Sequence, residues 1–149
     1  MLRIELATEL TEELVEAFAR LVPQLSDRAT APTSDELVSI LESPVTRVLL
    51  ARDDQSIVGT LTLVLFPIPT GIRAWIEDVV VDESARGQGA GAALTREAIR
   101  RAADAGARTV DLTSRHDRMA ANRLYEKLGF RRRETNVYRY EVEDSSGSL

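Results

Sequence analysis

The chain has 149 residues, of which 44% are hydrophobic, and this fits one domain whose core is large enough to fold without disulfides or a structural metal. It contains no cysteine, which excludes disulfide bonds, cysteine–zinc sites and a catalytic thioester on the protein. The formal net charge of -5 argues against general nucleic-acid binding. We therefore predict a single-domain protein with no nucleic-acid partner.

The apolar stretches are short, and the charge is unevenly distributed. No stretch approaches the roughly 20 residues that a membrane-spanning helix needs, and the N-terminal residues MLRIELATEL lack a secretory pattern. We therefore expect a cytoplasmic protein that does not bind membranes. The acidic excess lies in residues 1–81, whereas residues 82–149 carry more basic than acidic side chains. The second part of the chain is therefore suited to a polyanionic ligand.

The first predicted elements are a strand and two helices. Residues 2–6 alternate apolar and polar side chains, which indicates a strand. Residues 11–25 carry apolar side chains at helical spacing, so they predict an amphipathic helix. Thr33 and Glu36 have the spacing of a capping box for a second helix, which Pro44 ends.

The middle of the chain predicts three strands, which cover residues 46–52, 56–66 and 73–81. The first two are rich in β-branched residues and leucine around a short turn, which is typical of an antiparallel hairpin. The sequence FPIPTG then breaks the pattern. The third strand ends in VVV, apolar on both faces, as expected of a central strand covered on both sides.

The last third of the chain predicts helices over residues 89–105 and 118–128, and strands over 109–113, 131–135 and 137–142. Taken together, the order of elements predicts an α/β fold: a mixed, mostly antiparallel central sheet of about seven strands flanked by about four helices. One domain then covers residues 1–143. Residues 144–149 are polar and are predicted to form a disordered tail.

The segment RGQGAGA at residues 86–92 has the character of an anion site. Its glycines lie where a helix begins, so backbone N–H groups are left uncovered at the positive end of the helix dipole. Arg86 stands just before them and can add a charge-assisted hydrogen bond to a phosphate oxygen.

Two other phosphate-binding motifs compete with this interpretation. Gly87, Gly89 and Ala92 fit the dinucleotide pattern GxGxxG/A after a strand. However, residues 82–86 separate the strand from the glycines, and the chain lacks the βα units of a second mononucleotide-binding half. A Walker loop is excluded because no Gly-Lys-Ser/Thr follows. A dinucleotide-binding oxidoreductase therefore stays as the less favoured alternative.

Two segments resemble one known family. Residues 86–91, RGQGAG, resemble the Arg/Gln-x-x-Gly-x-Gly/Ala signature of the GNAT superfamily of N-acetyltransferases, and a V-x-V strand end precedes them. Residues 121–130, ANRLYEKLGF, are similar to its second signature, commonly A-x-x-L/F-Y-x-K-x-G-F. The resemblance spans nearly the whole chain. It implies a single N-acetyltransferase domain over residues 1–143, with the sheet splayed between strands 4 and 5, residues 73–81 and 109–113.

The resemblance also implies that acetyl-CoA, used as a cosubstrate without a metal, lies in this opening. The pantetheine arm would bond to the splayed strand as a partial extra strand, and the pyrophosphate would lie on the glycine amides. The cofactor-binding residues are then Val79, Val80, Val81, Arg86, Gly87, Gln88, Gly89, Ala90, Gly91 and Asn122. Four basic residues either form a solvated helix face or contact the adenosine 3′-phosphate of CoA: Arg115, Arg118, Arg123 and Lys127.

The chemistry needs an acid and a base. Without a cysteine to form an acyl-enzyme, direct attack by a primary amine in a ternary complex is the economical mechanism. The resemblance places Tyr125 beside the CoA sulfur as general acid; the alternative is an aromatic side chain that packs on the sheet. The resemblance favours Glu77 as the base. Strand alternation directs Asp78 to the opposite face. His116 is interpreted as a capping or surface residue.

The acceptor is expected to be a small-molecule or peptide amine, because the first two helices, which form much of the acceptor groove in this superfamily, carry many acidic residues. A solvated helix face explains the same residues. The four residues 76–79, IEDV, are similar to glucosamine-phosphate N-acetyltransferases but are too few to identify a substrate. A non-catalytic acyl-CoA sensor stays an alternative, and a homodimer stays open.

Overall fold

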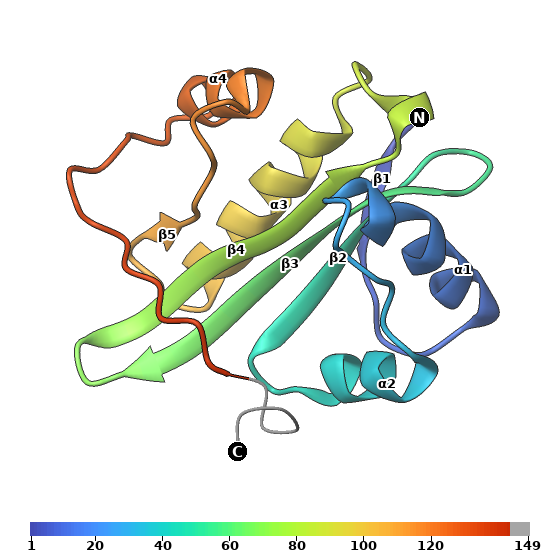
Figure 1. Ribbon diagram of the computed structural model, residues 1–149, viewed down its shortest axis with the longest axis horizontal. Helices are drawn as coiled ribbons and strands as arrows, with labels where there is room; N and C mark the ends of the chain where they lie inside the picture. Colours follow the sequence, from blue (N-terminus) through green and yellow to red (C-terminus); the bar gives the residue numbers. More distant parts are fainter. Residues whose placement is uncertain (144–149) are drawn as a thin grey trace.

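The computed structural model describes residues 1–143 (Figure 1); the predicted tail at 144–149 lies outside the described residues. The described elements, with two short 3-10 turns, are β1 (Arg3–Leu6), α1 (Glu12–Leu21), η1 (Val22–Gln24), α2 (Ser34–Glu42), β2 (Thr46–Arg52), β3 (Ile57–Ile68), β4 (Gly71–Val81), η2 (Glu83–Ala85), α3 (Ala90–Asp104), β5 (Val110–Asp111) and α4 (Met119–Lys127). No helix within residues 1–143 is long and apolar enough to cross a membrane.

The strands form one sheet in the order β1-β2-β3-β4-β5. β1 to β4 pair antiparallel, and β5 lies parallel to β4, so the predicted mixed, mostly antiparallel sheet is confirmed. The predicted break at FPIPTG is wrong: Pro67 pairs with Ile72 and Ile68 with Gly71, so the hairpin continues to a two-residue turn. Pairing with the neighbouring strand outweighs the local preference of the prolines, as is typical where tertiary contacts decide strand length.

Helices cover both faces of the sheet and produce two apolar cores. On one face, α3 runs along the strands (Figure 1), and Leu94, which is fully buried, packs with Leu61 and Leu63 of β3. On the other face, α1 and α2 bury Leu14 and Leu37 in the second core. The four predicted helices are therefore present, and the sheet lies between two layers, as expected of an α/β domain.

The start of α2 shows how closely local signals fix an element. The Thr33 hydroxyl accepts a hydrogen bond from the Glu36 amide at 3.2 Å, and the Thr33 amide donates to the Glu36 carboxylate at 2.8 Å. This reciprocal pair is the predicted capping box. The hydrogen bond from the Thr33 backbone lowers the pKa of Glu36.

The predicted strands at 131–135 and 137–142 are wrong in this structure, which has five strands rather than about seven within the described residues. Residues 131–143 adopt no regular structure, and the side chains of Val137, Tyr138, Tyr140 and Val142 are 75% to 88% exposed. β5 offers only two residues for pairing. High strand propensity does not form a strand where the neighbouring edge is this short.

Candidate active site

The glycine segment has the backbone that the sequence predicts for an anion site. Gly87 and Gly89 have φ angles of 82° and 88°, in the region that glycine adopts without a steric cost. Gly89 is the N-cap of α3, and no side chain caps this end of the helix. The first amides of α3 therefore stay open to a ligand at the positive end of the helix dipole.

A β-bulge interrupts β4 just before this segment. Thr62 of β3 pairs with Glu77 and Thr60 pairs with Val80, so β4 has one residue more than β3 between these pairs. Within the described residues, Asp78 is the one non-glycine residue with positive φ, at 49°. Strict alternation of faces therefore ends at Asp78, so alternation does not direct Asp78 to the face opposite Glu77. Such strained positions concentrate at functional sites.

The bulge resets which side of the sheet the last residues of β4 face. Val79 and Val81 pack against the core under α3, whereas Val80 packs with the core under α1 and α2. Ala74 and Ile76, before the bulge, also belong to the core under α3. The extra residue thus shifts the alternation by one position.

Beyond its first half, β4 has no partner on the side of β5. The two strands pair only at Ala74 with Val110 and at Trp75 with Asp111. Within the described part of the chain, residues 76–81 therefore have one sheet neighbour, β3, and their outer edge is open. An open strand edge can bind an extended ligand that carries amide groups.

The helix α4 brings the second sequence signature to the first. A methyl group placed on Gly91 would lie 3.4 Å from the Leu124 side chain, so α4 lies against the beginning of α3. Asn122 donates a hydrogen bond from Nδ2 to the carbonyl oxygen of Arg115 at 3.0 Å. The Asn122 amide therefore ties α4 to the loop before it, a contact that the sequence did not predict; its role towards a cofactor stays a prediction.

Tyr125 on α4 is partly buried and packs edge-on against Phe130, with 5.7 Å between the ring centroids. Burial raises the pKa of the Tyr125 hydroxyl, and the charge of Arg118 opposes this effect. The Phe130 amide donates to the Tyr125 carbonyl at 2.9 Å. The ring thus packs on Phe130, while the role of the hydroxyl as general acid stays a prediction.

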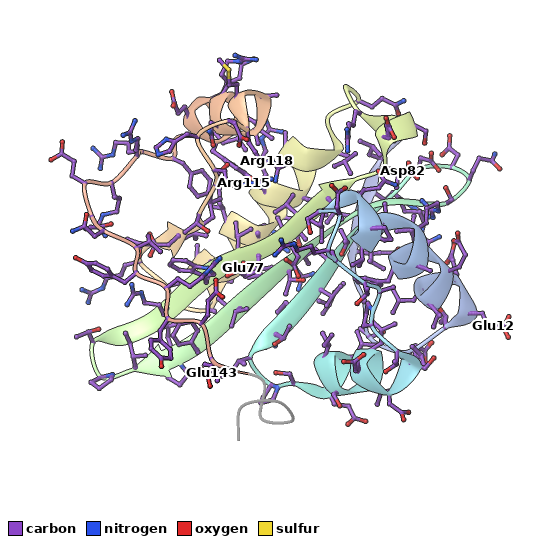
Figure 2. All side chains as sticks on the ribbon, in the orientation of Figure 1. Glu12, Glu77, Asp82, Arg115, Arg118 and Glu143 are labelled. Carbon is purple, nitrogen blue, oxygen red and sulfur yellow. The ribbon has the colours of Figure 1, made fainter. Side chains whose placement is uncertain are left out.

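Glu77 is exposed on β4 (Figure 2). Its carboxylate accepts a hydrogen bond from the Trp75 ring nitrogen at 2.6 Å, as expected of two residues on the same face of a strand. The neighbouring Arg73 lies 4.0 Å from Asp111, and no ion pair of Glu77 is found among the described residues. The role of Glu77 as a base stays a prediction.

The other titratable candidates lie at the surface. His116 is exposed, which agrees with the surface role predicted for it. The four basic residues considered for the 3′-phosphate are all exposed as well: Arg115, Arg118, Arg123 and Lys127. Figure 2 places two of them, Arg115 and Arg118, on the stretch that joins β5 to α4. Their exposure fits both alternatives.

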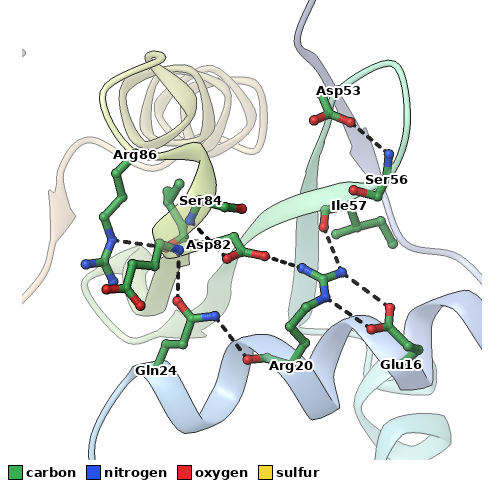
Figure 3. Close-up of polar contacts among 11 residues, drawn as sticks. Glu16, Arg20, Gln24, Asp53, Ser56, Ile57, Asp82, Ser84 and Arg86 are labelled. Atoms are coloured by element: carbon green, nitrogen blue, oxygen red, sulfur yellow. Dashed lines mark hydrogen bonds and ion pairs between the residues drawn. The ribbon is translucent and has the colours of Figure 1, made fainter.

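Residues 82–86, the lead-in to the glycine segment, are held by α1, and the sequence does not predict this contact. Arg20 Nη1 donates to the Asp82 carboxylate at 2.6 Å, across 62 residues (Figure 3). The Glu83 amide donates to Gln24 Oε1 at 2.9 Å. No sequence signal reveals such contacts, because neither residue belongs to a motif and the pairing depends on the tertiary fold.

A groove with a volume of about 460 Å³ lies on the outer side of α1, and its walls are formed by Leu10, Thr11, Glu12, Val15, Glu16, Ala19 and Ser34. None of the predicted cofactor-binding residues lines it. Among residues 1–143, no group of three or more metal-ligating side chains is arranged to hold a metal ion; the predicted absence of a metal stays untested.

An open strand edge that leads to an uncapped, glycine-rich helix N-terminus is suited to an elongated ligand with phosphate groups. Comparison with known protein families identifies the class of protein. Residues 6–130 match the acetyltransferase (GNAT) family. The chain belongs to this family and is an acyltransferase, as the two sequence signatures predicted.

Solved structures share this fold, whereas no curated protein matches the chain. A transcriptional regulator from Bacillus halodurans C-125 is 27% identical, with a TM-score of 0.81 and coverage of 95% of this chain and 100% of the other. A putative acetyltransferase from Agrobacterium tumefaciens str. C58 is 25% identical, with a TM-score of 0.83 and coverage of 93% and 99%. An aminoglycoside acetyltransferase from an uncultured soil metagenomic sample shares the fold, with a TM-score of 0.84 at 22% identity and coverage of 96% and 97%.

Proposed function

We propose that this protein transfers an acetyl group from acetyl-CoA to a primary amine, by direct attack in a ternary complex. The observation that carries the proposal is the meeting of three features: the open edge of β4, the uncapped start of α3, and α4 with Tyr125. Each suits a different part of acetyl-CoA, and family membership supports their combination.

The cosubstrate would extend from β4 to α3. Backbone groups of Val79, Val80 and Val81 are proposed to bond to the pantetheine amides along the open edge. The pyrophosphate is proposed to lie on the amides from Gly87 to Gly91, because positive charge and free N–H groups coincide at this helix end. Arg86 is exposed beside them, although its Nε donates to the Val81 carbonyl at 3.3 Å.

In the proposed reaction, the amine nitrogen bonds to the acetyl carbon and the carbon–sulfur bond breaks. Glu77 accepts the proton that the amine loses, directly or through water. Tyr125 donates its proton to the departing thiolate; its raised pKa keeps that proton in place at neutral pH. The amide of Val79, directly after the strained Asp78, is proposed to donate a hydrogen bond to the thioester oxygen.

The acceptor class is proposed to be a small-molecule or peptide amine. The groove on α1 does not identify it, because Figure 2 shows Glu12, which lines that groove, on the opposite side of the molecule from Glu77. One structure of the same fold is named an aminoglycoside acetyltransferase, but its identity to this chain is too low to assign that substrate here. A cytoplasmic location and a homodimer stay predictions.

Ligand-dependent thermal stability tests the cosubstrate. We expect CoA and acetyl-CoA at 100 times their Kd to stabilise the protein by about 2.7 kcal/mol, whereas NAD(P)H at equal concentration leaves Tm unchanged. A shift with NAD(P)H alone would favour the dinucleotide-binding alternative.

Turnover is then measured with a panel of amines by detecting the released thiol. Acetyl transfer to at least one primary amine supports the enzyme. CoA binding without turnover of any amine, from aminoglycosides and polyamines to amino acids and peptide N-termini, would favour the non-catalytic sensor.

A further inference from the structure

Arg20, near the end of α1, joins three parts of the molecule (Figure 3). Its guanidinium donates to Asp82 Oδ2 at 2.6 Å, to the carbonyl oxygen of Ile57 at 3.1 Å, and to Glu16 at 3.1 Å. Asp82 follows β4 directly and is the N-cap of η2. Its carboxylate accepts a hydrogen bond from the Ser84 amide at 3.2 Å. The planar guanidinium, with several N–H donors in a fixed geometry, suits such a junction.

Gln24 provides a second connection between α1 and the same lead-in. Its Oε1 accepts from the Glu83 amide at 2.9 Å, and its Nε2 donates to the Arg20 carbonyl at 3.2 Å. Both side chains thus come from the end of α1 and its 3-10 extension, and both contact residues 82–83. Two separate contacts to consecutive residues constrain the direction of the chain there more than either contact alone.

The Arg20–Asp82 pair is shielded from water more than an ordinary surface ion pair. The Arg20 side chain is 31% exposed and that of Asp82 is 14% exposed. Burial would raise the pKa of Asp82, but hydrogen bonds from the Ser84 amide and from Arg20 outweigh it and keep that pKa below its usual value. The carboxylate is therefore charged at neutral pH, as the contact requires.

The lead-in determines where the glycine segment begins. The Asp82 amide donates to the Val58 carbonyl at 2.7 Å, so the end of β4 is fixed on β3. The residues from Glu83 to Gly89 then set the direction of the α3 N-terminus. Because Gly87 and Gly89 are conformationally free in isolation, contacts outside the segment must select one conformation.

We propose that Arg20 and Gln24 are positioning residues that hold residues 82–86 so that the glycine segment is preorganised for the pyrophosphate of acetyl-CoA. The inference rests on the proposed function for its ligand, but not for the conformation of the loop. It assigns to α1 a part in cosubstrate binding.

Three variants test the inference: Arg20→Ala, Gln24→Met, which keeps the length of the side chain but removes the acceptor, and Arg20→Ala combined with Asp82→Ala. Titration calorimetry measures the Kd for acetyl-CoA. We expect Arg20→Ala to weaken binding about tenfold, as for loss of a hydrogen bond to a charged group. Asp82→Ala alone completes the double-mutant cycle. Because Asp82 also accepts from the Ser84 amide, the double variant can bind acetyl-CoA more weakly than Arg20→Ala. Its loss of affinity should still be smaller than the sum of the losses in the two single variants, because both of these remove the Arg20–Asp82 contact.

Arg52→Ala is the matched control. Arg52 also bridges α1 to the sheet, with 2.7 Å and 2.9 Å to Glu13 and 3.0 Å to Glu5, but it does not contact residues 82–86. Its loss should lower Tm and leave the Kd for acetyl-CoA unchanged. An equal loss of affinity in Arg52→Ala and Arg20→Ala would reduce Arg20 to a stabilising role and overturn the proposal.

Hydrogen exchange without any ligand separates this inference from the proposed function. The amides of Glu83 and Ser84 should exchange faster in Arg20→Ala and Gln24→Met than in the wild type, and at the wild-type rate in Arg52→Ala. Unchanged exchange in both variants refutes the positioning role. If the wild type binds no acetyl-CoA, the proposed function fails, and the exchange rates alone decide whether α1 orders the loop.

Discussion

At the scale of single residues, Tyr125 carries the sharpest prediction. Tyr125→Phe should keep the Kd for acetyl-CoA within about twofold but lower kcat roughly 100-fold, because a general acid contributes 10²–10⁴-fold. Tyr140→Phe is the control, since Tyr140 is 88% exposed. This variant should turn over the substrate at the wild-type rate. Steady-state kinetics on an amine from the panel measures both. An unchanged kcat in Tyr125→Phe would remove the acid assignment.

The pH dependence of the same step follows from the direction of the Tyr125 pKa. Because burial raises this pKa above the ordinary value of about 10, the hydroxyl keeps its proton to higher pH than a solvated tyrosine does. The loss of kcat that Tyr125 ionisation causes should therefore appear only above about pH 10. A basic limb that starts near neutral pH and persists in Tyr125→Phe belongs to another group.

At the scale of elements, two glycines at the start of α3 differ in backbone conformation. Gly89 has a φ of 88°, so Gly89→Ala should cost roughly 1–2 kcal/mol of stability and weaken CoA binding. Gly91 lies within the helix, where alanine is favoured over glycine by about 1 kcal/mol, and its added methyl group would meet Leu124 at an ordinary 3.4 Å.

Thermal denaturation of the two variants tests this difference. Gly91→Ala should have the wild-type Tm or a higher one, while Gly89→Ala should have a lower one. Equal losses of Tm would show that the glycines at this helix end are needed for space rather than for backbone conformation. Only the conformational reason makes Gly89 part of the anion site itself.

Elements with strong local signals could be predicted from the sequence, and elements that depend on partners could not. The capping box at Thr33 and Glu36 forms as predicted, because its donors and acceptors lie within one turn. The extension of β3 through Pro67 and the bulge in β4 at Asp78 were not foreseen. Both depend on which residue of β3 lies opposite, and that register is a property of the pair of strands.

At the scale of the whole molecule, the sheet is asymmetric. β3 is covered by strands on both sides, whereas none of the amides of residues 131–143 donates a backbone hydrogen bond within the described part of the chain. Hydrogen exchange of the unliganded protein should therefore be slowest in β3 and fastest in residues 131–143. Protection of 137–142 equal to that of β3 would instead support the two further strands that the sequence predicted.

The sequence by itself determined the local chemistry: the glycines that allow positive φ at the start of α3, the second signature with Tyr125, and the order of elements through α4. These follow from conformational preferences over a few residues. Only the tertiary structure decided that β4 bulges at Asp78, that β5 pairs at two positions, and that Arg20 reaches Asp82 across 62 residues. Such contacts depend on the packing of the whole domain, because residues distant in sequence meet only once the sheet has formed.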